Sequence, residues 1–295
     1  MGKTVKACLC IVGVGGLVSS GAPACAVDTR ARVVAFGDVH GAYTDWTALL
    51  RELGVIDAKN NWSGGDTHLV SLGDLVDRGP GSRQVVELLM KLDSQAEKAG
   101  GAVHMVLGNH EVMVMTGDLR YVSDAEFAAF APDETAADRD ALFADYRRFN
   151  PGGKPATVRA TFDEQYPPGF VALRKAYSRD GALGRWLIEQ PFVIRVNDKV
   201  YMHGGIASEY SEQTIASINS KAQGELRDFL DNLRSEVQST TSEIKLPSPG
   251  ELAERIARWI VDEDRCGLRP TINATGILLH TGLGRAPLAE PAISA

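Results

Sequence analysis

Four short polar clusters, each directly after an apolar run, contain residue types that can hold metal ions. Asp38 and His40 lie in G-D-V-H-G, Asp74 in G-D-L-V-D-R-G, Asn109 in G-N-H-E and His203 in H-G-G. Carboxylate and amide oxygens combined with imidazole nitrogens suit iron, manganese or zinc. We therefore expect these five residues to form a centre for two divalent metal ions.

Asp74 is the predicted bridging ligand of this centre, because a carboxylate has two oxygens and can contact both ions. The first ion would be held by Asp38, His40 and Asp74, and the second by Asp74, Asn109 and His203. Two ions about 3.5–4 Å apart can activate a water molecule and stabilise an in-line displacement at phosphorus. The chemistry that these residue types favour is therefore phosphoester hydrolysis.

Three further polar residues lie beside these ligands in the sequence. His110 follows Asn109 directly and is poorly placed to bind the same ion, so we expect it to act as the general acid that protonates the leaving group. Asp77 would orient and charge its imidazole. Arg78 offers a planar guanidinium that matches phosphate oxygens.

Strands must deliver these clusters to one place. The apolar runs at 32–36, 68–72 and 103–107 are predicted strands, each followed by one cluster. Two helical patterns lie between them. In the first, Trp46, Leu49, Leu50 and Leu53 share one face, and the second pattern covers 82–98. Strands alternating with helices predict an α/β fold with a mainly parallel sheet, in which ligands bind beyond the carboxyl ends of the strands.

The rest of the chain has a different pattern. Residues 112–190 contain several helical stretches and the breakers Pro-Gly-Gly and Pro-Pro-Gly, which predict a mostly helical insertion that shapes the substrate opening. Residues 192–196 and 199–202 read as a hairpin about Asn197-Asp198, which would deliver His203. A helical pattern over 211–237 and a Ser/Thr/Pro-rich linker follow.

Composition and the N-terminus bear on cellular role. The net charge of −7 disfavours a general nucleic-acid binder. The sequence contains no run of 18 apolar residues, so it predicts no membrane span. Lys3 and Lys6 precede an apolar run at 7–18, and Ala24-Cys25-Ala26 is a small-x-small cleavage pattern. Residues 1–26 are therefore a predicted signal peptide, and the protein is expected in the periplasm or outside the cell.

The four clusters together resemble the phosphoprotein phosphatase branch of the calcineurin-like metallophosphoesterases. The flanks G-G-D-T-H-L-V-S-L-G-D and G-D-L-R-Y-V-S are similar to those of bacterial Shewanella-like protein phosphatases, and the resemblance covers about 30–235. It implies a β-sandwich with a βαβαβ core and flanking helices, two Mn, Fe or Zn ions, and direct water attack on phosphoserine, phosphothreonine or phosphotyrosine. It also implies the ligand, acid-pair and phosphate-binding roles given above.

The C-terminal part of the chain departs from this family pattern. A second phosphate-binding arginine and a final G-H-T histidine are expected after His203, and neither is found. Residues from about 245 on instead resemble an N-terminal fragment of selenocysteine synthase (L-seryl-tRNA selenium transferase), and they lack its lysine-bearing cofactor core. The sequence thus divides into a metallophosphoesterase domain over 27–240 and a foreign-looking tail over 241–295. His280, in L-L-H-T-G, is the one histidine left that could replace the missing ligand.

Three functions remain open at this level. The first is a metal-dependent phosphatase that acts on phosphorylated proteins or small phosphomonoesters. The second is a metal- or phosphate-binding module with little or no activity, because the C-terminal ligand segment is missing. The third is a dinucleoside polyphosphate hydrolase, since such enzymes share the same motifs.

Overall fold

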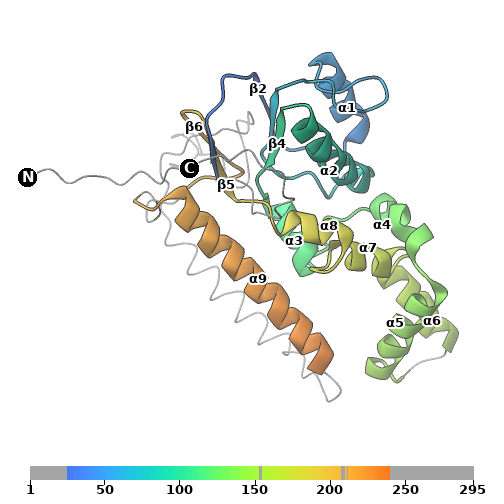
Figure 1. The fold of residues 1–295 in the computed structure, drawn as a ribbon. Helices are drawn as coiled ribbons and strands as arrows, with labels where there is room; N and C mark the ends of the chain where they lie inside the picture. Colours follow the sequence, from blue (N-terminus) through green and yellow to red (C-terminus); the bar gives the residue numbers. More distant parts are fainter. Residues whose placement is uncertain (1–24, 153–154, 207–209, 211, 240–295) are drawn as a thin grey trace, which may run out of the picture.

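The computed structural model describes residues 25–152, 155–206, 210 and 212–239 (Figure 1). Its strands are β1 (Ala26–Val27), β2 (Val33–Phe36), β3 (His68–Ser71), β4 (Ala102–Met105), β5 (Val193–Val196) and β6 (Lys199–Met202). Its helices are α1 (Tyr43–Glu52), α2 (Ser82–Lys98), α3 (Asn109–Thr116), α4 (Asp124–Phe130), the 3₁₀ helix η1 (Ala131–Asp133), α5 (Ala136–Phe149), α6 (Pro155–Gln165), α7 (Phe170–Tyr177), α8 (Ala182–Leu187) and α9 (Ile215–Ser239).

The strands form two small sheets that pack against each other. One sheet has the order β2-β3-β4, with every pair parallel, and α1 and α2 connect its strands. The other has the order β1-β5-β6, in which β1 and β5 are parallel and β5 and β6 form the predicted hairpin. Val70, Leu72 and Val106 of the first sheet meet Ile194 and Val196 of the second in a shared core. The α/β sandwich expected from the sequence is confirmed.

The larger hydrophobic core lies between the β2-β3-β4 sheet and the helices. In α2, which the sequence predicts over 82–98, Val85, Val86, Leu89 and Leu92 are all fully buried. In α1, Trp46 and Leu50 are buried, but the expectation for Leu49 was wrong, because its side chain is 45% exposed. The apolar face of α1 is therefore narrower than its sequence pattern indicates.

The insertion is mostly helical, as predicted, and its helices α3 to α8 extend away from the sheets (Figure 1). Residues 124–149 form two α-helices rather than one, and Pro132 falls in η1, between α4 and α5. Ser123 and Thr135 cap α4 and α5 by accepting backbone N–H groups of the first turn. The long helix α9 contacts α3 and β5 and buries Leu226 and Leu230.

His68 and His104 contact each other on the neighbouring strands β3 and β4. His68 Nδ1 lies 2.9 Å from His104 Nε2, and the two rings are stacked with centroids 5.1 Å apart. Burial lowers the pKa of His104 to about 4, so its imidazole is neutral at pH 7. A hydrogen bond between the two imidazoles, rather than a charged pair, therefore links β3 and β4 at this point.

Several predictions fall partly or wholly outside the described residues. The predicted signal peptide lies almost entirely before residue 25, although Ala26 pairs with Arg195 in β1 and β5. The tail over 241–295, His280 included, lies beyond residue 239. Among the described helices, none is long and apolar enough to cross a membrane.

Candidate metal centre

The four polar clusters converge at the carboxyl ends of the strands. Asp38 and His40 follow β2, Asp74 follows β3, Asn109 opens α3 just after β4, and His203 follows β6. Parallel strands place their carboxyl ends at one edge of a sheet, which is where loops form ligand sites in α/β folds. The structure thus brings together all five of the residues proposed as ligands from the sequence.

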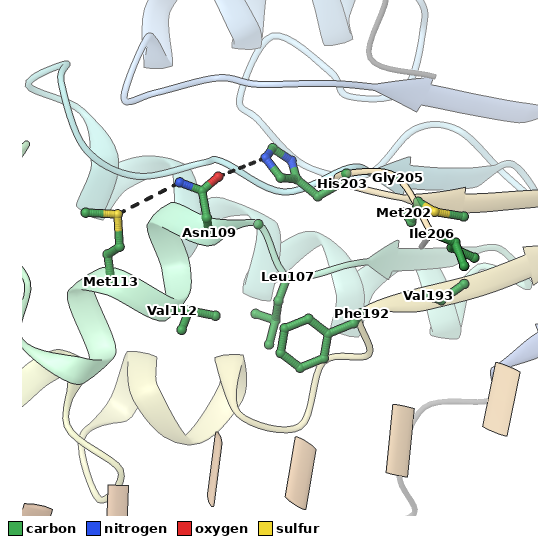
Figure 2. A pocket seen from close by; sticks show the side chains of 12 residues that line it. Leu107, Asn109, Val112, Met113, Phe192, Val193, Met202, His203, Gly205 and Ile206 are labelled. Carbon is green, nitrogen blue, oxygen red and sulfur yellow. Dashed lines mark hydrogen bonds between the residues drawn. The ribbon is translucent and has the colours of Figure 1, made fainter. Parts of the chain in front are cut away.

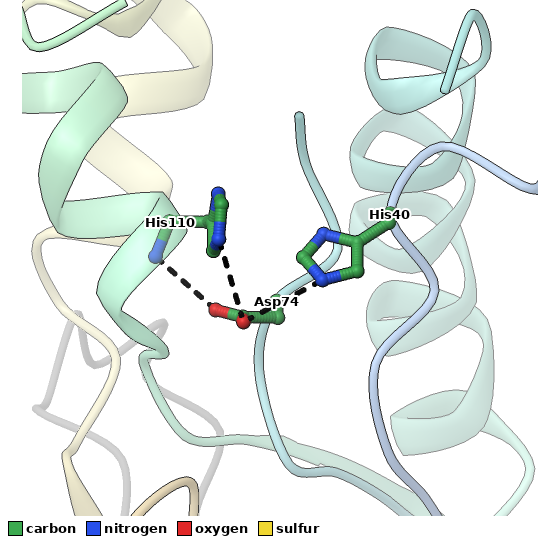
Figure 3. A group of neighbouring side chains, drawn as sticks. All are labelled: His40, Asp74 and His110. Atoms are coloured by element: carbon green, nitrogen blue, oxygen red, sulfur yellow. Dashed lines mark hydrogen bonds and ion pairs between the residues drawn. The ribbon is translucent and has the colours of Figure 1, made fainter. Parts of the chain in front are cut away.

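Asp74 lies at the middle of this group and is 2% exposed. Its Oδ2 is 3.7 Å from His40 Nε2 and 3.9 Å from His110 Nε2 (Figure 3). The same oxygen is 3.2 Å from His203 Nε2. Two sets of ligand atoms that could hold an ion, His40-Asp74-His110 and Asp38-Asp74-His203, each lie within 4.8 Å of one another. Asp74 belongs to both sets, which is the geometry that a bridging carboxylate requires.

The predicted division of the ligands between two ions agrees only partly with these sets. The first ion was expected to take Asp38 with His40, and Asp38 Oδ2 does lie 3.9 Å from His40 Nε2. The compact sets instead group Asp38 with His203, and they group His40 with His110. The carboxylate of Asp38 is therefore close to the ligand nitrogens of both His40 and His203.

Two histidines are oriented so that Nε2 faces the centre. His40 Nδ1 donates to Val76 O at 2.9 Å, and His203 Nδ1 donates to Leu72 O at 2.8 Å. A backbone acceptor on Nδ1 fixes the tautomer that leaves Nε2 to bind a metal. His40 Nε2 is buried and has no hydrogen-bond partner among the described residues. These donors fit a divalent transition-metal ion, because such an ion would satisfy a nitrogen that the protein leaves unused.

The charges around Asp74 are tightly coupled. Burial alone raises the pKa of Asp74, but the hydrogen bond and charge of His203 outweigh burial, so that the pKa lies below its usual value. For His203 the effects have the opposite signs. Burial lowers its pKa, but its hydrogen bond with Asp74 and the charge of Asp74 raise that pKa to about 9. Without a metal ion, a protonated His203 thus compensates the buried carboxylate.

Asn109 lies at the open side of the centre, and its side chain is exposed. Its Oδ1 is 3.2 Å from His203 Nε2, and its Nδ2 points to the sulfur of Met113 on the same helix (Figure 2). A cavity of about 450 Å³ adjoins Asn109 and His203. Its walls are mostly apolar and include Leu107, Val112, Met113, Phe192, Val193, Met202 and Ile206.

His110 and Asp77 form a buried pair next to the centre. His110 Nδ1 is 2.6 Å from Asp77 Oδ2, and both residues are almost fully buried. Burial lowers the pKa of His110, but its hydrogen bond with Asp77 and the charges of Asp74 and Asp77 outweigh burial and raise the pKa above its usual value. A raised pKa favours the protonated imidazole, which is the form that a general acid requires.

Arg78 reaches the same point from the loop after β3. Its Nη2 is 3.2 Å from His110 Nε2, so the guanidinium and the imidazole face one location. Tyr121, from the insertion, packs its ring against His110 with centroids 5.1 Å apart. The predicted acid pair and the predicted phosphate-binding arginine are thus adjacent in space.

The loops that carry these residues have uncommon backbone angles. His40, Asp74, Asp77 and Arg78 have φ values of 46°, 54°, 69° and 68°, although none of them is glycine. Such left-handed conformations cost free energy, and they persist only where surrounding contacts hold them. Close packing of the loops contributes here, because a Cβ on Gly73 would collide with the backbone of Gly108.

Two buried glutamates hold the loop after β3, and neither was assigned a role from the sequence. Glu111 accepts backbone N–H groups of Asp74 at 2.9 Å, Leu75 at 2.7 Å and Gly108 at 2.9 Å. Glu126 accepts the N–H of Asp77 at 3.1 Å. Burial raises the pKa of both carboxyl groups.

The signal for these glutamates was present in the sequence. Each lies three residues after a helix N-cap, Glu111 after Gly108 and Glu126 after Ser123, and each side chain accepts the N–H of that N-cap residue. This spacing is typical of a helix start. It identifies the helix, but it does not reveal that the second carboxylate oxygen reaches a distant loop.

Comparison with known proteins agrees with this geometry. The family model described as calcineurin-like phosphoesterase matches residues 31–243. Shewanella-like protein phosphatase 2 of Arabidopsis thaliana is 31% identical over 216 residues, which are 67% of this chain and 52% of that protein. The chain therefore spans about half the length of this plant relative.

A solved structure and a second kind of relative were also found. The crystal structure of a cold-active protein-tyrosine phosphatase from a psychrophilic Shewanella species has a TM-score of 0.50 and 28% identity, and the alignment covers 80% of this chain and 65% of that one. L-seryl-tRNA(Sec) selenium transferase of Moorella thermoacetica is 44% identical over 69 residues, which are 23% of this chain and 14% of that enzyme. The second match is therefore confined to a small fragment.

Proposed function

The chain belongs to the calcineurin-like phosphoesterases, and we propose that it is a metal-dependent phosphatase that hydrolyses phosphomonoesters of proteins. One observation carries the proposal: a shared carboxylate, Asp74, lies among ligand-type histidines directly beside the His110-Asp77 pair and Arg78. The similarity to protein phosphatases, one of them a tyrosine phosphatase by name, supports a phosphoprotein substrate.

The protein residues would divide the reaction as follows. Arg78 binds the phosphoryl oxygens, and the pair of nitrogens on its guanidinium orients the phosphorus toward Asp74. His110 donates the proton on Nε2 to the leaving oxygen, while Asp77 holds Nδ1 and stabilises the charged imidazole. Water supplies the new oxygen on phosphorus, so the products are an alcohol or phenol and inorganic phosphate.

Two divalent ions, manganese, iron or zinc, are the proposed cofactors. The residues that would hold them are Asp38, His40, Asp74, Asn109 and His203. Bound ions of this kind lower the pKa of coordinated water and neutralise phosphate charge. The buried Nε2 of His40, which has no hydrogen-bond partner among the described residues, supports a metal at this position.

The test is turnover of p-nitrophenyl phosphate by the full chain after chelation and after manganese is added back. We expect activity that depends on manganese and that falls strongly in His110→Asn. Activity that is indifferent to manganese or to His110→Asn would contradict the proposal. A single tight metal ion per chain with no turnover would instead identify a metal-binding module, and faster cleavage of dinucleoside tetraphosphate than of a phosphopeptide would identify a nucleotide hydrolase.

We further propose that the protein is exported to the periplasm or the medium. The support is the sequence of residues 1–26, with two lysines, an apolar run and the Ala24-Cys25-Ala26 pattern. Expression of the full chain in a bacterial host, followed by fractionation and N-terminal sequencing, tests the proposal. A periplasmic product that begins at Val27 is expected, and an uncleaved cytoplasmic product would contradict it.

A further inference from the structure

Tyr121 is a large aromatic side chain that remains exposed at the mouth of the site. Tyr121 is 45% exposed, and the centroids of its ring and of the His110 ring are 5.1 Å apart. The guanidinium carbon of Arg78 is 5.8 Å from the centre of the same ring. The ring thus packs against both the proposed acid and the proposed phosphate-binding group, and nearly half of the residue stays exposed.

The backbone of Tyr121 has a separate task. Its carbonyl oxygen accepts the N–H of Arg78 at 2.9 Å, and Arg78 has the left-handed φ of 68°. This hydrogen bond holds the Arg78 loop and would form with any side chain at position 121. The contact of the aromatic ring with His110 is therefore a second feature, which the hydrogen bond does not explain.

The position of the ring determines what a leaving group meets. In the proposed function, the phosphoryl group lies against Arg78 and the leaving oxygen receives its proton from His110. The rings of His40 and Tyr121 both pack on His110, and Tyr121 is the more exposed of the two, so the organic part of the substrate extends past Tyr121. Aromatic rings interact favourably with one another in offset or edge-to-face arrangements, beyond the gain from burying their area.

We propose that Tyr121 is a specificity-determining residue that contacts the leaving group and favours aryl phosphomonoesters, such as phosphotyrosine, over the alkyl phosphates of serine and threonine. The inference rests on the proposed function. Water attacks phosphorus, the bond from phosphorus to the phenolic oxygen breaks, and that oxygen takes the proton from His110. The phenol released at this point lies against the Tyr121 ring.

The experiment compares two phosphopeptides that are identical except for phosphotyrosine or phosphoserine, with the manganese-loaded full chain. Tyr121→Ala is expected to lower kcat/KM about tenfold for the phosphotyrosine peptide and less than threefold for the phosphoserine peptide. Tyr121→Phe should keep the wild-type preference, since it keeps the ring. Phe149→Ala removes a similarly exposed ring, 51% exposed on α5, and should leave both rates unchanged.

A binding measurement separates this inference from the proposed function. Phenylphosphonate and methylphosphonate carry the same charged group but cannot be hydrolysed in the same way, so their affinities do not depend on turnover. Tyr121→Ala should weaken phenylphosphonate binding about tenfold and leave methylphosphonate binding unchanged. Equal effects on both phosphonates, or on both peptides, would overturn the role of Tyr121. Absence of turnover in the wild type, with the phosphonate difference intact, would overturn only the phosphatase proposal.

Discussion

His110 Nδ1 lies 2.6 Å from Asp77 Oδ2, and the two residues are 2% and 0% exposed. The short contact leaves Nε2 as the only ring nitrogen that can exchange a proton with a substrate. That nitrogen faces Asp74 at 3.9 Å and Arg78 at 3.2 Å. The pair therefore points at the place where the predicted metal ligands and the predicted phosphate-binding side chain meet.

Replacing His110 tests its role as the proton donor. Because a positioned general acid contributes about 10²–10⁴-fold to rate, His110→Asn should lower kcat by a factor in this range. Asp77→Asn should lower it less, since the imidazole stays in place but loses its negative partner. Steady-state kinetics measure both effects, and metal content measured in parallel serves as the control. Activity of His110→Asn within twofold of wild type would exclude the role.

Removing a ligand tests the metal centre directly. His40→Ala and His203→Ala should each weaken manganese binding by more than about 100-fold. Mutation of residues that only hydrogen-bond to a metal ligand already lowers metal affinity about 10–100-fold. Titration calorimetry on protein from which a chelator has removed bound metal gives the manganese affinities and the number of ions per chain. Asp198→Asn is the matched control, because that carboxylate is 83% exposed at the β5-β6 turn. Two ions are expected in the wild type, and unchanged binding in both histidine variants would refute the assignment.

Glu111 should be essential to stability rather than to chemistry. Glu111→Ala leaves the buried N–H groups of Asp74, Leu75 and Gly108 without their acceptor. Since each unsatisfied buried donor costs about 1–3 kcal/mol, we expect the free energy of unfolding to fall by roughly 3 kcal/mol or more. Urea denaturation measures the loss. Glu87→Ala, which removes an exposed helical ion pair with Arg83, should cost about 1 kcal/mol or less.

The His68-His104 contact predicts a dependence of stability on pH. The pKa of His104 is lowered by burial to about 4 in the folded protein, below the ordinary value of 6.5. Between these values the unfolded chain binds the proton and the folded protein does not, so stability is full above pH 6.5 and is lost as pH falls toward 4. The loss should be about 3 kcal/mol, by the equivalence of one pKa unit to 1.36 kcal/mol.

Denaturation curves between pH 4 and pH 7 measure this dependence, with the chelated protein used throughout. His104→Leu, which cannot be protonated, should flatten the curve in this window, although His68, whose pKa is also lowered by burial, continues to titrate nearby. An unchanged slope in His104→Leu would show that other groups cause the acid sensitivity.

The positions of the candidate ligands were predictable because strand ends are a local property of the sequence. Asp38, Asp74 and His203 each follow a short apolar run, and short apolar runs that end in turn residues are typical of buried strands. Parallel pairing of β2 and β3 then brings the first two together without any further information. The helices were also predictable from apolar spacing, apart from Leu49, which the surrounding elements leave exposed.

The amino-acid sequence by itself thus determined the residue types of the centre, their order along the strands and the α/β class. Only the tertiary structure decided the contacts between residues far apart in the chain: Glu111 to the loop after β3, Glu126 to Asp77, and Tyr121 against His110. The physical reason is that local patterns encode secondary structure, whereas these contacts depend on how separate helices and loops pack. A glutamate three residues into a helix looks the same in sequence whether it only caps that helix or also holds a catalytic loop in place.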